Sequence, residues 1–502
     1  MSKNNFILLF AVFLFALILR FLYFPENTYF GFDQARDAYA VKEILEGDFK
    51  VTGPPTANGI FRHGVMYYYF FAPFYFFSNG DPVLVSAFLR ILNAAGVFIV
   101  YPLTFTLFGG GAALLASFLF AISYEQTQFA LFLNHPSLAV LSVLIFYLGL
   151  AFLFFKKRNW GLYLAAFGLG LSIQFEFVET QLLAVFTLSL ILFRKALPKL
   201  NPKYIIFSAI SFLLPISTYL ISEIKNDFTI VKQLPKLMSG SANLAPDLSR
   251  FVFIINRHLK DNFSENQFGV LLVGVIMLVS LIFFFTRNLY RKQLIFLTLW
   301  FFGGLLVYFI TSDQAYFYNT GTSVALLIFA GFLLSKLFSK NFLLVIPILL
   351  LILFSNLNLV TKNNPLGPND KINPQKGLLI EDEKKAIDFI YQKAEKKEFS
   401  VNALTMPYNV NTTWSYLFEW YGKKKYGYVP VWGGDAAAGF AGNLKVETAR
   451  SKLPQMRFLI IEPQEGIPAY MAESFLRNEE VYSEVLEKKQ FGTIEVRVQK
   501  AK

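Results

Sequence analysis

Two aspartates stand four residues apart in the segment "YFGFDQARDAYAVKEILEG", residues 29–47, which directly follows the first long apolar stretch. Side chains at that spacing lie on one face of a helix. Asp33 is suited to cap such a helix, and Asp37 to interact favourably with its macrodipole. A carboxylate partly desolvated among aromatic residues at a membrane boundary is also more basic, which suits a general base. The residues alone leave both interpretations open.

Apolar residues recur at helical spacing after Asp37, which predicts an amphipathic helix lying in the membrane interface. We expect Lys42 and Glu46 to pair one turn apart and Gly47 to end the helix.

Two loops carry cations that could bind a phosphate group. Arg62 and His63 occur in the first loop, and Arg257, His258 and Lys260 occur in "INRHLKDNF". Preorganised cations stabilise the charge that grows on a departing phosphate. For the first pair, binding of bulk anionic lipid is the alternative.

Further polar residues lie near the same predicted boundary. Arg90 is about eight residues inside an apolar segment, where an unpaired guanidinium is costly, so we expect it to pair with a carboxylate. The candidate partners are Asp33, Asp37, Glu125 and Glu176. His135, in "FLNHPSLAV", is a site candidate or a satisfied loop histidine.

The chain of 502 residues is 55% hydrophobic and contains 59 Phe, which is typical of a polytopic α-helical membrane protein. We interpret the N-terminus as a retained first helix rather than a cleaved signal peptide, because no small-residue cleavage site follows it. The sequence predicts about eleven transmembrane helices, at residues 1–24, 82–107, 111–128, 137–155, 160–175, 178–193, 204–222, 267–286, 293–311, 319–335 and 341–360.

Basic loops predict the orientation. If the spans alternate, Lys3 and the Lys- and Arg-rich loops after residues 155, 193, 286 and 335 share one side, which should be cytoplasmic. We therefore expect a multi-pass plasma membrane protein with a cytoplasmic N-terminus and long outer loops at 25–81 and 223–267. The net charge of +12 belongs to these loops, and we expect no nucleic acid partner.

The tail changes character after the last apolar segment. Residues 362–502 contain one segment with helical spacing, "EDEKKAIDFIYQKAEKK", and three strand-like runs, "FSVNALTM", "RFLIIEP" and "GTIEVRVQK". We predict a small extracytoplasmic α/β domain here and a transmembrane catalytic module over residues 1–361.

The order of motifs resembles the GT-C membrane glycosyltransferases, in particular the family 39 type that includes protein O-mannosyltransferases and lipid A aminoarabinose transferases. The resemblance rests on "FDQARDA", "GPPT", "FRHG", "YYYFFAPF" and "FLNHPSLAV". Two departures concern Gln34, where many relatives have a glutamate, and Glu176, where relatives often have a histidine.

This resemblance implies a GT-C fold and an inverting transferase. The enzyme would move a hexosyl or pentosyl group from a polyprenyl-phosphate-linked donor to an acceptor lipid, glycan or protein on the outer face. It also implies that Asp33 is the catalytic base, with Asp37 as its helper.

Other functions remain open from the residues. The chain requires no cofactor, although Asp33 and Asp37 could bind a divalent metal through oxygen. Alternative functions are a transporter or flippase for lipid-linked saccharides, another carrier-lipid enzyme such as a ligase or polymerase, and a non-catalytic receptor.

Overall fold

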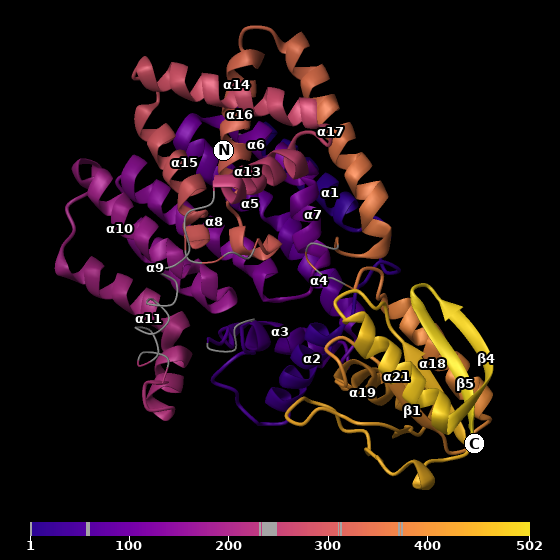
Figure 1. Ribbon diagram of the computed structural model, residues 1–502. Coiled ribbons are helices and arrows are strands. Elements are labelled where there is room, and N and C mark those ends of the chain that lie inside the picture. Colours follow the sequence, from indigo (N-terminus) through magenta and orange to yellow (C-terminus); the bar gives the residue numbers. More distant parts are fainter. Residues whose placement is uncertain are drawn as a thin grey trace.

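The computed structural model describes residues 3–56, 61–229, 232, 248–309, 311, 314–369, 372 and 375–502. A large stack of helices makes up most of the molecule, and a smaller unit with the strands lies beside one end of it (Figure 1). The middle of the predicted second outer loop lies outside the described residues.

Each of the eleven predicted apolar segments overlaps a helix. These helices are α1 (Lys3–Arg20), α4 (Pro82–Ala95), α5 (Val97–Phe108), α6 (Gly110–Ile122), α8 (His135–Phe155), α9 (Trp160–Phe175), α10 (Leu182–Leu192), α11 (Pro202–Lys225), α14 (Gln267–Thr286), α15 (Arg291–Gly303), α16 (Val324–Phe338) and α17 (Phe342–Asn363). Within the described residues, six helical stretches are long and apolar enough to cross a membrane. A multi-pass helical protein is thus supported, whereas the number of eleven crossings is not confirmed.

Helix α8 is the most enclosed of the long apolar helices, with 72% of its apolar window buried. It packs closely against α9 because glycines line their contact. A Cβ at Gly149 would lie 2.3 Å from the backbone nitrogen of Ala165, so only a residue without a side chain fits. Small residues of this kind let membrane helices approach closely. Helices α8 and α9 are therefore held in close contact at Gly149.

The first loop forms two helices, α2 (Phe32–Leu45) and α3 (Met66–Phe77), which pack against each other. Helix α2 ends as predicted, with Gly47 at a φ of +100°. It does not form the predicted contact between Lys42 and Glu46, because Lys42 pairs with Glu419 at 3.3 Å.

The C-terminal unit contains a five-stranded sheet of order β2-β1-β3-β5-β4. Strand β1 pairs in parallel with β2 and β3, and β5 pairs antiparallel with β3 and β4. The strands are β1 (Ser400–Leu404), β2 (Val431–Trp432), β3 (Met456–Ile461), β4 (Ser483–Phe491) and β5 (Ile494–Ala501). The three predicted runs correspond to β1, β3 and β5, and the predicted helix corresponds to α18 (Ile380–Ala394).

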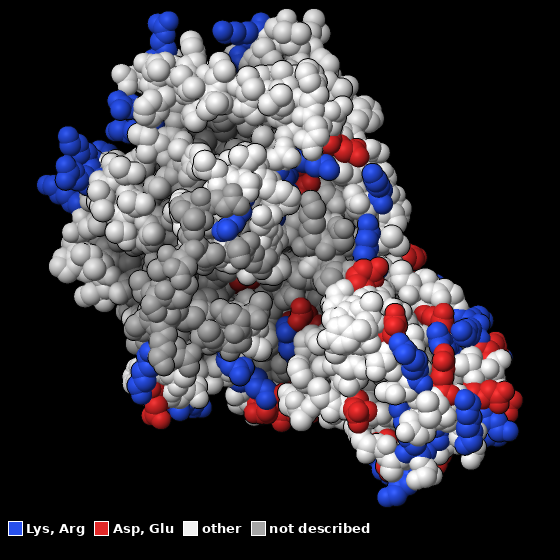
Figure 2. Space-filling view, viewed as in Figure 1, with Lys and Arg blue, Asp and Glu red and all other residues white. Residues whose placement is uncertain are grey.

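The C-terminal unit and the first loop share one hydrophobic core. The backbone of Phe30 donates to Leu378, and Tyr416 Oη in α19 (Thr412–Leu417) donates to the Gly80 carbonyl at 2.7 Å. On the face seen in Figure 2, the described part of the helical stack is mostly uncharged, whereas the C-terminal unit carries many charges of both signs. The domain boundary at 361 stays a prediction.

Candidate active site

The start of α2 is capped by a glutamine rather than by an aspartate. Gly31 is the N-cap residue, and the Gln34 side chain accepts a hydrogen bond from its backbone N–H at 3.1 Å. Gln34 also donates to the Leu133 carbonyl at 3.0 Å. The capping interpretation of Asp33 is therefore wrong, and Gln34 has a structural role. The Asp33 side chain is 42% exposed.

Arg36 lies between the two aspartates and binds both. Its guanidinium donates to Oδ1 of Asp33 at 2.6 Å and to Oδ1 of Asp37 at 2.8 and 2.9 Å. Asp37 is buried, with only 2% of its side chain exposed, and it also accepts from Tyr68 Oη at 3.2 Å. The two carboxylates therefore differ in solvent accessibility. Asp33 is partly exposed, whereas Asp37 is buried and binds the same guanidinium.

Helix α8 supplies the opposite wall of this cluster. Asn134 caps α8 by accepting from the backbone N–H of His135 at 2.7 Å, and Pro136 occupies the first turn, where a missing N–H costs nothing. His135 Nε2 thereby lies 3.2 Å from Asp37 Oδ2, and Asn134 Nδ2 lies 3.4 Å from Asp33 Oδ2. The positive end of the helix dipole faces both carboxylates.

Burial and charge oppose each other at the buried members of the cluster. Burial alone would raise the pKa of Asp37, but Arg36 and His135 outweigh it and hold this pKa below its usual value. The same Asp37 charge, added to burial, raises the pKa of Tyr68. At neutral pH Asp37 is therefore an anion and Tyr68 a neutral donor.

His63 lies next to this cluster but does not act as a cation. Its ring centre is 5.5 Å from that of His135, and its Nδ1 is 3.8 Å from Glu176 Oε1. Burial, helped by His135 and Arg36, lowers the pKa of His63 to about 3. Gly64 holds this segment against α9, because a Cβ there would lie 2.1 Å from Gln174. His63 is thus a neutral neighbour, and Glu176 is buried behind it.

Glu125, Arg257 and His258 form a second cluster, between α7 (Tyr124–Leu131) and α13 (Leu248–Asn262). Glu125 accepts from Asn262 at 2.6 Å and lies 3.2 Å from His258 Nδ1.

Arg257 donates to Asn319 at 2.8 Å and stacks on Tyr316. The side chains of Glu125, Arg257 and His258 are all buried. Glu125 and His258 contact each other, and none of the three contacts Asp33 through a hydrogen bond or ion pair among the described residues.

Arg90 has no carboxylate partner among the described residues, so the predicted ion pair is wrong. Its guanidinium donates to the Arg20 carbonyl at 2.7 Å and to Asn27 Oδ1 at 2.9 Å, and it stacks on Phe24. Carbonyl oxygens and an aromatic face satisfy the buried cation where α1 and α4 meet. Arg90 therefore ties helices together.

Two of the predicted phosphate ligands lie outside the cluster around Asp33, and three residues of that cluster were not predicted from the sequence. Arg62 is exposed, and Lys260 is partly buried; neither forms an ion pair with a described residue. The residues that sequence reasoning missed are Arg36, Asn134 and Tyr68. The first two carried a signal, since Arg36 is three residues from Asp33 and Asn134 adjoins His135.

The carboxylates do not offer an obvious metal site. Among the described residues, no group of three or more His, Asp or Glu side chains is placed to hold an ion. The Arg36 guanidinium already occupies the space between the Oδ1 atoms of Asp33 and Asp37.

A cavity of about 1100 Å³ opens along the next face of α2, between α3 and the C-terminal unit. Lysines and aromatic rings line it, including Lys42, Tyr75, Tyr416, Trp420 and Lys423. A ligand of some size can therefore approach α2 from the side of the C-terminal unit.

Solved structures with a similar fold are membrane proteins. ArnT from Cupriavidus metallidurans in the apo state has a TM-score of 0.60 at 12% identity, covering 99% of this chain and 98% of that one. The same protein bound to undecaprenyl phosphate has a TM-score of 0.57. The archaeal oligosaccharyltransferase AglB from Archaeoglobus fulgidus has a TM-score of 0.47 at 13% identity, and this chain covers 62% of its length.

No protein-family model and no curated protein sequence matches this chain. ArnT, an aminoarabinose transferase, belongs to the GT-C superfamily. The likeness to ArnT extends over nearly the whole of both chains, the C-terminal unit included. The protein therefore shares the fold of ArnT, as the family resemblance of its sequence predicts.

Proposed function

We propose that this protein is an inverting membrane glycosyltransferase that moves a sugar from a polyprenyl-phosphate donor to an acceptor hydroxyl or phosphate. The observation that carries the proposal is the half-exposed Asp33 carboxylate, held by Arg36 in front of the buried Asp37. The fold shared with ArnT, one structure of which contains undecaprenyl phosphate, supports a lipid-linked donor.

The reaction needs a base with a free oxygen. Oδ1 of Asp33 accepts from Arg36, while Oδ2 has, among the described residues, only the long 3.4 Å contact with Asn134. Oδ2 is therefore the oxygen that takes the proton as the acceptor oxygen attacks the anomeric carbon. The bond from that carbon to the phosphate oxygen breaks, and the carrier phosphate leaves with the electron pair. A single displacement inverts the anomeric centre.

Arg36 is the group best placed to receive the departing phosphate. A guanidinium has five N–H donors, and three of them bind Asp33 and Asp37, which leaves two for an incoming oxygen. The carboxylates fix the guanidinium plane before substrate binds, so its reorganisation costs little during the reaction. This assignment replaces the loop cations Arg257 and Lys260.

The acceptor would enter through the cavity along α2. Lys423 and Lys424 contribute positive charge to its lining, Lys42 is paired there with Glu419, and Tyr416 and Trp420 offer aromatic faces. These groups suit an acceptor that carries sugar rings or phosphate groups. In this arrangement the reaction takes place on the outer face, as the basic loops predict, and the sugar transferred is a hexose or pentose.

Transfer from defined donors tests the proposal. The purified protein in lipid would be incubated with radiolabelled polyprenyl-phosphate sugars and membrane acceptors, comparing Asp33→Asn with Glu46→Gln. Removing the base should slow transfer about 10²- to 10⁴-fold. Glu46 is an exposed carboxylate at the end of the same helix, so its variant should retain full activity. Full transfer by Asp33→Asn, or no transfer by the wild type from any donor, would refute the proposal.

A further inference from the structure

A second pocket lies at the far end of α8 from the Asp33 cluster. It has a volume of about 550 Å³ and lies between α1, α5 and the loop that joins α8 to α9. Helix α8 has 21 residues, so its two ends are about 30 Å apart, which is the thickness of the hydrocarbon core. His135 at one end contacts Asp37, and Lys156 follows the other end. The pocket therefore lies at the opposite membrane boundary from the candidate active site.

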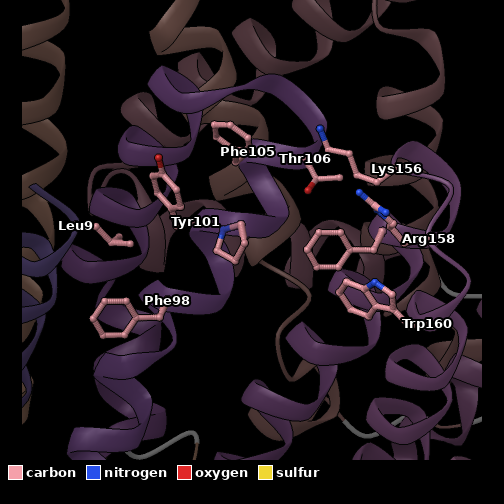
Figure 3. Close-up of a pocket in the computed structure, with 10 residues that line it drawn as sticks. Leu9, Phe98, Tyr101, Phe105, Thr106, Lys156, Arg158 and Trp160 are labelled. Carbon is pink, nitrogen blue, oxygen red and sulfur yellow. The ribbon is translucent and has the colours of Figure 1, made fainter. Parts of the chain in front are cut away.

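The two ends of this pocket differ in chemistry. Figure 3 shows Thr106, Lys156 and Arg158 together at one end, while Leu9 and Phe98 lie at the other. Pro102, Phe105, Phe152 and Trp160 make up most of the remaining wall. The pocket thus combines a polar, cationic end with an apolar body.

The cations at the polar end are not neutralised by the protein. Neither Lys156 nor Arg158 forms an ion pair with a described residue, and both side chains are exposed. The Lys156 ammonium lies 5.8 Å from the centre of the Phe105 ring, which orients it toward the wall. Two unpaired cations beside a hydroxyl suit a phosphate group.

We propose that this pocket binds an anionic phospholipid, with the phosphate on Lys156, Arg158 and the Thr106 hydroxyl and one acyl chain along Phe98 and Phe105. The volume is within the range of small-molecule sites, and the exposed rings face the region where acyl chains begin. The inference does not depend on the proposed transfer reaction.

Native mass spectrometry of the purified protein, titrated with phosphatidylglycerol or phosphatidylcholine of the same acyl chains, tests the site. Each basic residue near a lipid phosphate contributes about a fivefold change in affinity. We expect Lys156→Gln and Arg158→Gln each to weaken phosphatidylglycerol binding about fivefold. Phosphatidylcholine should bind more weakly than phosphatidylglycerol to the wild type.

The neighbouring lysine provides a matched control. Lys157 lies between the two cations, is exposed, and does not line the pocket. Lys157→Gln removes the same charge from the same loop and should change affinity less than twofold. A further variant, Thr106→Phe, keeps every charge but fills the pocket, and it should abolish the selective binding.

Three outcomes would overturn the proposal. Equal binding of the two lipids would show that the net negative charge of the lipid is not recognised, because both carry the same phosphate group. An effect of Lys157→Gln as large as that of Lys156→Gln would show diffuse surface attraction. Unchanged binding by Thr106→Phe would show that the lipid lies elsewhere.

Discussion

Two clusters in this molecule use the same chemical parts in different surroundings. In the first loop, Asp37 lies 3.2 Å from His135. Between α7 and α13, Glu125 lies 3.2 Å from His258 and accepts from Asn262. In both, a buried carboxylate meets a buried histidine beside an asparagine.

The difference is a second carboxylate with access to a ligand. The first cluster adds Asp33, 42% exposed, on the far side of Arg36. In the second cluster Glu125 and His258 are at most 2% exposed. A carboxylate–histidine pair is therefore no sign of catalysis by itself. It stabilises helix packing where it is sealed, and it can orient a reacting group where one of its neighbours remains accessible.

The largest expected effect is at Arg36. Arg36→Gln should slow transfer about 10²- to 10³-fold, because the departing phosphate loses its preorganised donor. Arg36→Lys keeps the charge without the planar fork and should recover part of this loss. Initial transfer rates, together with thermal unfolding of each variant, measure the effect. Full activity of Arg36→Gln in folded protein would place the phosphate at another cation.

A mutation in the buried cluster around Glu125 should lower the stability of the protein rather than its transfer rate. Glu125→Ala leaves His258 and Asn262 buried without their acceptor, so unfolding should become easier by about 2–5 kcal/mol. Transfer per folded molecule should stay within about threefold of the wild type. Thermal unfolding in detergent and rates normalised to folded protein separate the two effects. A rate loss like that of Asp33→Asn would assign the second cluster to the reaction.

A third buried carboxyl group, that of Glu383, differs from both clusters because it has no hydrogen-bond partner among the described residues. Neither oxygen of Glu383 in α18 forms a hydrogen bond with a described residue, and burial, with help from Glu462, raises its pKa well above the usual value. A raised pKa means that the folded state is favoured below about pH 4.5 and loses stability as the pH rises toward the folded pKa.

Replacing the Glu383 carboxyl group with a neutral amide should remove this loss of stability at high pH. At pH 8, Glu383→Gln should be more stable than the wild type by about 1 kcal/mol or more, since each pKa unit corresponds to about 1.4 kcal/mol. At pH 5 the gap should be smaller. Unfolding temperatures across this range provide the measurement, and a gap independent of pH would contradict the explanation.

The smallest expected effect is that of a chelator. Because Arg36 already lies between Asp33 and Asp37, transfer should continue at the same rate in EDTA. The rate before and after adding EDTA, with Mg²⁺ and Mn²⁺ added back, checks this. A large loss that a metal restores would mean that the two aspartates separate from Arg36 to bind an ion.

Local patterns predicted much of the architecture, whereas the position of the active site stays a prediction. The apolar segments became helices, and the spacing after Asp37 became α2. Strands β1, β3 and β5 followed their alternating runs, whereas β2, only two residues long, and the charged β4 gave too weak a pattern to recognise.

The sequence by itself determined a mostly helical protein with long apolar helices and a small C-terminal sheet, and its motif order predicted the ArnT-like fold, because hydrophobic periodicity and motif order are local properties of the chain. Only the tertiary structure decided the partners of each polar group. It paired Arg36 with both aspartates, satisfied Arg90 with carbonyl oxygens and separated His258 from Asp33. These choices depend on how distant helices pack, and a buried charge binds whichever acceptor that packing brings within reach.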